Sequence, residues 1–324
     1  MPRGTRARRR LVALGAVTAA MLAGTAGLAQ AAPAALAGQG LSAAGRGTPV
    51  IVVHCPRQNL QSKISAAAAG SVLVVVGHCR GTFTVSKNLT LAGAPGAVLD
   101  GCRAGTTLTV SDDARVYLAN LTITGGRTTG DGGGIHNDSG GTVTLSASTV
   151  RGNTATASTS GGGGIFNDGT MTVTRSTVRG NTASYGGGIL NDYTMTVTGS
   201  TVLANTASYG GGIFNNRTMT LTRSAVLGNT ARNGGGILNG DTLTASLTAV
   251  LGNTAREHGG GIYNSSGTAT VYRSQVRGNT ARGGRGSGGG IYNINKGTVR
   301  LRYSQVRRNT PDNCAPPGSV AGCS

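Results

Sequence analysis

Three aspartates stand at equivalent places in successive copies of a repeated motif, where they could carry acid–base or cation chemistry. Asp138, Asp168 and Asp192 each follow the asparagine of a GGGI-x-N block. If the copies stack as parallel strands, neighbouring carboxylates lie about 5 Å apart and alternate ones about 10 Å apart. The shorter separation suits a retaining glycoside hydrolase, and carboxylate oxygens also bind Ca²⁺. Asn-Asp-Gly is an ordinary turn sequence as well, and glycine and serine take the place in later copies, so a plain turn is the favoured alternative.

His136 is the histidine best placed for a catalytic role, because it lies in the same copy as Asp138. The other three histidines do not converge with it. The chain contains no metal-ligand spacing, nucleophile elbow or phosphate loop. The catalytic candidates are therefore limited to this histidine and the three aspartates, and the only cofactor to consider is Ca²⁺ at those aspartates.

A second set of columns suits binding better than catalysis. The x of GGGI-x-N alternates outward and is aromatic or aliphatic, with the rings at Phe166, Phe214, Tyr263 and Tyr292. Arginine pairs flank another strand, at Arg151 and Arg179 and again at Arg277 and Arg307. Exposed rings beside guanidinium groups are typical of a groove for acidic glycans. The alternative is that loops near residues 150–160 and 280–287 cover the row.

A repeat of about 24 residues positions all of these side chains. The GGGI-x-N block recurs seven times, with Ile at 135, 165, 189, 213, 237, 262 and 291, and an Asn-Thr pair recurs in phase. In one copy we expect three short strands, Ile189–Asn191, Thr194–Thr198 and Thr201–Leu203, with Met195 and Val197 facing inward. Three strands per copy predict one coil of a parallel β-helix. The 57 glycines argue against helical repeats.

Stacked coils would place each residue about 4.8 Å above its counterpart. Aliphatic columns then supply the core of a chain with no Trp and three Phe. The two asparagine columns should form amide ladders at the turns. Upstream, we expect two or three less regular coils from strands at Val72–Val76, Thr82–Val85, Leu89–Leu91, Leu108–Val110 and Val116–Ile123. A helix over Asn59–Ala69 should cover the open apolar end.

The first residues predict export. Residues 1–10 carry five arginines and no acid, residues 11–28 are small and apolar, and Ala29-Gln30-Ala31 fits a cleavage site. Sec and twin-arginine export both stay open, because Arg8-Arg9-Arg10 loosely fits the second signal. No further apolar stretch follows, so we expect no transmembrane segment.

The charge of the remaining chain is strongly positive. Without those five arginines, 24 Lys and Arg stand against 10 Asp and Glu, a formal charge near +14. After Glu257, nine basic residues face only Asp312. Such a surface favours polyanions, which outside a cell means acidic polysaccharide or wall polymers rather than a specific nucleic acid. The alternative is that the arginines serve solubility alone.

The cysteines of an exported chain point to disulfides rather than to metal. Cys314 and Cys323 close a short loop and should pair. Cys55, Cys79 and Cys102 leave one cysteine over, and three pairings are open. Cys79–Cys102 spans about one coil, within disulfide reach; Cys55–Cys79 would clip the cap to the first coil and is the pairing that we favour.

The repeat GGGIFNDGTMTVTRSTVRGNTAS (residues 162–184) resembles the coils of bacterial parallel β-helix repeat proteins with a pectin-lyase-like fold. It is also similar to polymorphic outer-membrane-protein repeats, and the closing Asn309–Cys314 stretch resembles exported actinobacterial members. The resemblance covers about residues 49–324 and implies the fold. The superfamily includes lyases, hydrolases, adhesins and phage tailspikes, so no single activity follows. The catalytic sets of aspartates, histidine and basic residues that the lyases and hydrolases of this fold use cannot be identified in this sequence.

These observations predict an all-β, right-handed, three-sheet parallel β-helix with about seven regular coils. The expected divisions are a signal peptide (1–31), a flexible segment (32–49), an N-terminal cap (50–70), irregular lead-in coils (71–126), the seven repeats (127–310) and a disulfide-closed tail (311–324). We expect a monomeric, secreted and wall-associated protein that binds acidic polysaccharide or serves as a structural surface protein. The alternatives are a polysaccharide lyase or glycoside hydrolase, and an adhesin.

Overall fold

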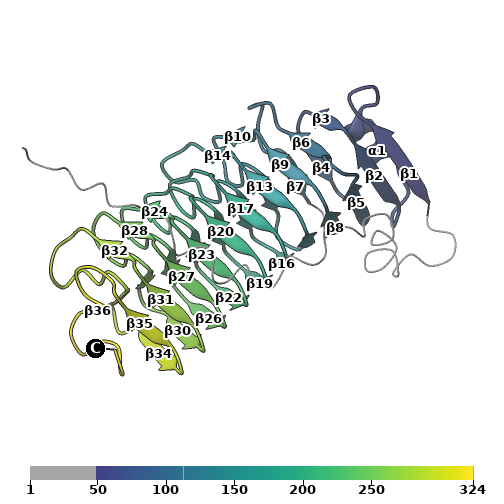
Figure 1. Ribbon diagram of the computed structural model, residues 1–324. Helices are drawn as coiled ribbons and strands as arrows, with labels where there is room; N and C mark the ends of the chain where they lie inside the picture. Colours follow the sequence, from purple (N-terminus) through teal and green to yellow (C-terminus); the bar gives the residue numbers. More distant parts are fainter. Residues whose placement is uncertain (1–48, 112, 324) are drawn as a thin grey trace, which may run out of the picture. The chain divides into compact units, whose positions relative to one another are not determined.

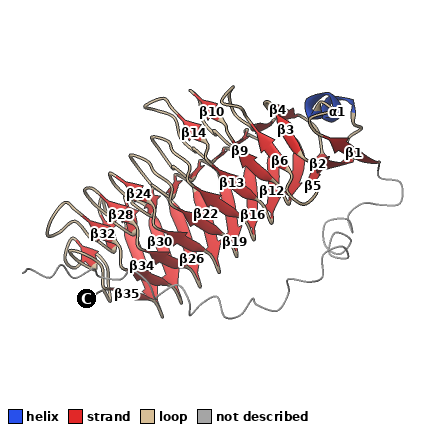
Figure 2. Cartoon of the chain, turned by 45° about the horizontal axis from the view of Figure 1, so that its top comes forward, coloured by secondary structure: helices blue, strands red, loops and turns tan. Residues whose placement is uncertain are grey.

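The chain forms a three-sheet parallel β-helix in the computed structural model, which describes residues 49–111 and 113–323. Strands of successive coils lie side by side along each sheet (Figure 1). Apart from one short helix, the described residues form strands and turns (Figure 2). The expected signal peptide, and all but the last residue of the segment 32–49, lie outside the described residues.

Each sheet stacks its strands in chain order. Sheet A contains β1 (Val50–His54), β2 (Val72–Val76), β5 (Leu89–Gly93), β8 (Arg115–Ala119), β12 (Thr142–Ser146), β16 (Thr170–Thr174), β19 (Thr194–Thr198), β22 (Thr218–Thr222), β26 (Thr242–Ser246), β30 (Thr268–Tyr272) and β34 (Thr298–Arg302). Sheet B contains β3 (His78–Arg80), β6 (Val98–Asp100), β9 (Thr122–Thr124), β13 (Thr149–Arg151), β17 (Thr177–Arg179), β20 (Thr201–Leu203), β23 (Ala225–Leu227), β27 (Ala249–Leu251), β31 (Gln275–Arg277) and β35 (Gln305–Arg307).

Sheet C carries the GGGI-x-N blocks. Its strands are β4 (Phe83–Val85), β7 (Leu108–Val110), β11 (Ile135–Asn137), β15 (Ile165–Asn167), β18 (Ile189–Asn191), β21 (Ile213–Asn215), β25 (Ile237–Asn239), β29 (Ile262–Asn264), β33 (Ile291–Asn293) and β36 (Cys314–Ala315). Short strands bridge the turn from sheet B to sheet C: β10 (Arg127–Thr128) with β14 (Thr154–Ala155), and β24 (Thr230–Ala231), β28 (Thr254–Ala255) and β32 (Thr280–Ala281).

The core is built from columns of identical or similar aliphatic residues, as the repeat predicts. Equivalent residues pair directly from coil to coil, Met171 with Met195 and Met195 with Met219. The isoleucines that open the sheet C strands of the seven repeats are fully buried. Because strand side chains alternate between the two faces, the residues between these columns face outward.

Two buried asparagine ladders hold the coils in register. One runs from Asn137 to Asn293 through amide-to-amide hydrogen bonds of 2.7–2.9 Å. The other runs from Asn153 to Asn309 at 2.9–3.1 Å. The first ladder ends at Asn137, because Val110 holds its place in the preceding coil, and Asn137 Oδ1 is left buried without a partner. The predicted ladders are therefore confirmed.

Two corners of each coil use left-handed backbone. After sheet B the position is glycine in six of eight coils, with φ near 60° in the regular repeats (Gly125, Gly152, Gly180, Ala204, Gly228, Gly252, Gly278, Arg308). Between sheets A and B only one of eight residues is glycine (Asn120, Ala147, Arg175, Gly199, Arg223, Leu247, Arg273, Tyr303). We call these the glycine corner and the side-chain corner. The expected strand Val116–Ile123 is in fact two strands, β8 and β9, because Asn120 turns the chain between sheets.

The number of coils exceeds the expectation. Sheet A has eleven strands, whereas seven regular and two or three lead-in coils predict nine or ten. The difference arises because Val50–His54, which we expected to belong to a cap, is already a strand that pairs with β2. The helix, α1 (Leu60–Ala66), is shorter than expected, and Leu60 and Ile64 join the core. Its Gln61 exchanges hydrogen bonds with the backbone of Thr84, so the side chain continues sheet C beyond β4.

Both favoured disulfides are present. Cys55 pairs with Cys79, and Cys314 with Cys323. Cys102 carries an exposed free thiol. The described residues contain no helix with the length and hydropathy of a membrane span.

Candidate functional site

The structure brings His136 and Asp138 together at the turn from sheet C to sheet A. His136 Nε2 lies 2.8 Å from Asp138 Oδ1, and Nδ1 lies 3.1 Å from the backbone carbonyl of Asp131. Both ring nitrogens of His136 therefore face oxygens that only accept hydrogen bonds. The ring also meets Phe166 edge-on, with centroids 4.8 Å apart. Both nitrogens of the imidazole are thus occupied by contacts within the protein, which is not the arrangement of a free general base.

Asp168 and Asp192 occupy the same turn in the next two coils. Asp192 Oδ1 accepts a hydrogen bond of 2.7 Å from Asn216 Nδ2. Burial raises the pKa of Asp192, and the charges of Asp168 and Asp131 raise it further against the effect of that hydrogen bond. Neighbouring carboxylates that repel one another favour protonation of one of them. Asp192 is therefore a carboxyl group of this column whose pKa is raised by burial and by the neighbouring charges.

The column of Asp138, Asp168 and Asp192 is also the candidate Ca²⁺ site. Among the residues that the structure describes, no group of three or more His, Cys, Asp or Glu side chains could hold a metal ion. Ca²⁺ at Asp138, Asp168 and Asp192 stays a prediction.

The aromatic column on sheet C lies outside the core, but a second column covers much of it. Phe166 is 9% exposed, and Leu190 and Leu238 are similarly buried. The covering residues come from the turn before the glycines, where Tyr185 stacks on Tyr209 at 5.3 Å and on Phe214 at 5.7 Å. Near the C-terminal end, His258 stacks on Tyr292 at 4.5 Å, and Tyr263 lies 5.2 Å from Tyr292. The stripe therefore packs largely against itself.

The predicted arginines do not join this stripe. Arg151 pairs with Arg179, and Arg277 with Arg307, all on the outer face of sheet B, whereas the aromatic column belongs to sheet C. Leucines hold the same place in the three coils between the pairs. The aromatic and arginine columns therefore lie on different sheets, and a groove formed by both stays a prediction.

Arginine and tyrosine do meet in the last two coils, at the side-chain corner and the adjoining strands. Arg273 Cζ lies 5.2 Å from the centroid of the Tyr272 ring, and that ring meets Tyr303 at 5.9 Å in a nearly perpendicular arrangement. Tyr272 pairs with Arg302 across β30 and β34. Tyr303 is 83% exposed.

These residues, with neighbouring Arg300 in β34 and Arg277 and Arg307 on sheet B, form what we call the arginine–tyrosine surface. Strands β30, β34, β31 and β35, which carry or flank it, lie together at the C-terminal end of the sheets (Figure 1). A planar guanidinium held over an aromatic ring can pair with a carboxylate while the ring stacks on a sugar.

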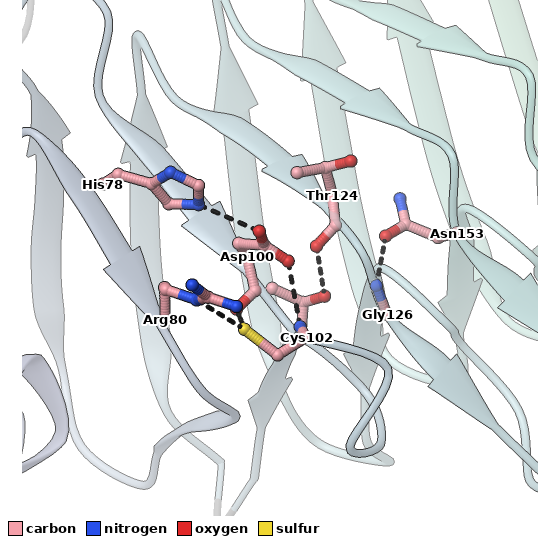
Figure 3. Close-up of polar contacts among 8 residues, drawn as sticks. His78, Arg80, Asp100, Cys102, Thr124, Gly126 and Asn153 are labelled. Atoms are coloured by element: carbon pink, nitrogen blue, oxygen red, sulfur yellow. Dashed lines mark hydrogen bonds and ion pairs between the residues drawn. The ribbon is translucent and has the colours of Figure 1, made fainter.

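A polar cluster that sequence reasoning missed surrounds Cys102 (Figure 3). Arg80 Nε donates to Cys102 Sγ at 3.2 Å, and the Cys102 backbone N–H donates to Asp100 Oδ1 at 2.9 Å. His78 Nε2 lies 2.9 Å from Asp100 Oδ2. Burial opposes the charge of Asp100, but the Cys102 N–H and the His78 ring outweigh it and lower the pKa of this carboxyl. The cluster exposes one sulfur that can be alkylated or oxidised.

Two of the shallow hollows on the described residues lie near the N-terminal coils. One, of about 260 Å³, is lined by residues that include Arg115, Tyr117 and Thr144, and the other, of about 280 Å³, lies beside Arg57 and Arg80. Neither includes the aspartate column or the arginine–tyrosine surface.

Two of the missed features had a signal in the sequence. Tyr185 and Tyr209 stand 24 residues apart before GGGI, and the corner residues recur at the same interval. The Cys102 cluster had none, because its members come from irregular coils whose register the sequence does not show.

Comparison with protein-family models, with curated proteins and with solved structures finds no significant match to this chain.

Proposed function

We propose that this protein is an exported, cell-surface or secreted β-helix that binds acidic polysaccharide through the arginine–tyrosine surface. The observation that carries the proposal is the contact of Arg273 and Tyr272 within an arginine-rich patch. After Glu257 the sequence contains one acidic residue, Asp312, so the patch has few internal partners for its charge. The two disulfides suit an oxidising compartment outside the cell.

Acidic polysaccharide suits this surface better than other polyanions. Its carboxylates match the planar fork of arginine, and its sugar rings match the exposed face of tyrosine. Resemblance of the repeats to a pectin-lyase-like fold is consistent with a glycan ligand, and contact with glycans of a neighbouring cell, as in an adhesin, would use the same surface.

The test is binding of purified protein to polygalacturonate, with dextran as the neutral comparison, at low and high salt. We expect salt-sensitive binding to polygalacturonate alone, because exposed charges are screened by added ions. Arg302→Ala and Tyr303→Ala should weaken it. Arg151→Ala, an exposed arginine of the first regular coil, is the matched control and should not.

Three outcomes would count against the proposal. They are equal binding of dextran, tighter binding of duplex DNA than of polygalacturonate, and loss of binding in the Arg151→Ala control only.

A second candidate, glycoside hydrolysis, is favoured by one observation: the raised pKa of Asp192 beside the charge of Asp168. Retaining hydrolysis uses a carboxylic acid of raised pKa together with a second carboxylate. Release of reducing ends from the same polysaccharides is the measurement. Activity lost in both Asp168→Asn and Asp192→Asn, but kept in Asn216→Ala, would support an active site here, and no release from any substrate would dismiss it.

A further inference from the structure

The outer face of sheet A is chemically uniform over its regular coils. Strands β16, β19, β22 and β26 present twelve outward positions, which are eleven threonines and one serine. Thr142 and Thr144 in β12, and Thr268 and Thr270 in β30, continue the pattern on both sides. We call these residues the threonine face. It contains no charged and no aromatic side chain, although the whole chain has 29 Lys and Arg.

Duplication of the repeat does not account for this uniformity, because other outward columns of the same repeats vary. On sheet B, one column reads Arg179, Leu203, Leu227 and Leu251 through the same four coils. The side-chain corner reads arginine, glycine, arginine and leucine. Strand propensity favours threonine but also accepts tyrosine and valine on exposed faces. Three adjacent columns thus hold threonine at all but one position, while the neighbouring columns vary from coil to coil.

The geometry of the threonine face is that of a two-dimensional lattice. Neighbouring strands of a parallel sheet lie about 4.8 Å apart, and alternate residues along a strand are separated by about 6.6 Å. Every strand pair on this face is in direct register, Thr172 opposite Thr196 and Thr196 opposite Thr220. Side-chain ladders can hold a sheet flatter than its natural twist, and the first asparagine ladder runs along the start of the sheet A strands, where Asn191 Nδ2 also donates to the carbonyl of Thr218.

The hydroxyls of the threonine face are available to an outside partner. Within the described part of the chain, the hydrogen bond of Thr242 to Asp241 is the one side-chain hydrogen bond that these threonines make to protein. Each remaining hydroxyl can both donate and accept, and each methyl group presents a small apolar surface beside it.

From this array we propose that the threonine face of sheet A binds the surface of ice. A ligand that fits it must be uncharged, repeat in two dimensions at spacings of a few ångströms, and both donate and accept hydrogen bonds. Ordered water at an ice surface meets all three requirements. A crystalline neutral polysaccharide is periodic too, but rings that stack on sugars would be expected for it, and the face has none.

The absence of charge has a physical reason under this proposal. Lysine or arginine on the face would hold a hydration shell of its own and stand above the plane of the threonines. Either effect breaks the match with a lattice. A rigid face of many hydroxyls can also bind as one body, so that each weak contact adds to the others at little further entropic cost.

The test is freezing hysteresis of purified protein, the gap between the melting and freezing temperatures of a single ice crystal, together with the shape of that crystal. We expect a measurable gap and faceted crystals. Thr196→Lys and Thr220→Lys, at the centre of the face, should each lose the gap. Leu203→Lys, an outward residue of sheet B in the same coil as Thr196, is the matched control and should keep it.

Folding is checked separately, because the side chains concerned point away from the core. All three variants should keep the wild-type thermal unfolding midpoint. Absence of hysteresis and of crystal shaping in the wild-type protein overturns the proposal. So does hysteresis that survives both threonine variants, and so does a threonine-dependent adsorption to crystalline cellulose or chitin without any effect on ice. None of these results bears on the arginine–tyrosine surface, which the polygalacturonate assay tests independently.

Discussion

The two corners of each coil solve the same backbone problem with different residues. Both require left-handed φ, yet the glycine corner is glycine in six of eight coils and the side-chain corner in one. A left-handed backbone costs a residue other than glycine about 1 kcal/mol. Glycine is therefore the expected choice wherever folding alone decides. The side-chain corner keeps arginine, leucine and tyrosine at this cost, and Arg273 and Tyr303 of the arginine–tyrosine surface are two of its members.

The difference continues one residue further along the chain. In seven of the eight coils, the glycine corner is followed by an asparagine of the second ladder, whose side chain is buried. In six successive regular coils, the side-chain corner is followed by a buried serine or threonine, whose hydroxyl bonds the carbonyl two residues before it. The asparagine makes more contacts between coils than the serine. We infer that the glycine corner serves the stacking of coils, while the side-chain corner is free to serve the surface.

The largest expected effect breaks the ladder behind the glycine corner. Asn229 donates to Val202 O at 3.1 Å and to Asn253 Oδ1 at 2.9 Å, and its Oδ1 accepts from the backbone and amide of Asn205. Asn229→Ala should lower the free energy of unfolding by about 3–5 kcal/mol, because it leaves several buried groups unpaired. Urea unfolding followed by circular dichroism measures it.

The matched control for the ladder is Asn216→Ala. Asn216 lies at the turn from sheet C to sheet A, and its exposed side-chain amide bonds only Asp192. Its expected cost is below about 1 kcal/mol, as for most surface substitutions. Equal losses in the two variants would show that burial of the ladder does not govern stability, and the contrast between the corners would lose its basis.

The sequence predicted the repeating part of this fold well and its surface poorly. The column of Ile135 and the asparagine ladders follow from a period of 24 residues, because residues one period apart become neighbours when the coils stack. The contact of Arg273 with Tyr272 does not follow from the period, because it depends on the direction in which the left-handed backbone at Arg273 points its side chain. The burial of Phe166 was predicted only as an alternative, because alternation alone places this side chain outside the core.

Moving a side chain into the glycine corner tests the strain of that backbone directly. Gly228 has φ of 57°, and a Cβ added to it would meet no atom within 4 Å. Gly228→Leu should therefore lower the free energy of unfolding by about 1 kcal/mol through backbone strain alone. Urea unfolding against wild type measures the change. A loss of several kcal/mol would mean that the corner selects glycine for space, which contradicts the open surroundings.

The reverse exchange at the side-chain corner should have the smallest effect and the opposite sign. Leu247 has φ of 51° and is 44% exposed, so little packing is lost when it is removed. Leu247→Gly should raise the free energy of unfolding by about 0.5 kcal/mol, since relief of strain exceeds the extra freedom that glycine gives the unfolded chain. Ala249→Gly, two residues on within strand β27, is the control and should lower stability by a similar amount. A single substitution would suffice to replace Leu247 by glycine. A confirmed gain in stability would therefore indicate that the side chains at this corner serve the protein surface rather than the stability of the fold. A loss at Leu247 would instead assign these side chains a packing role.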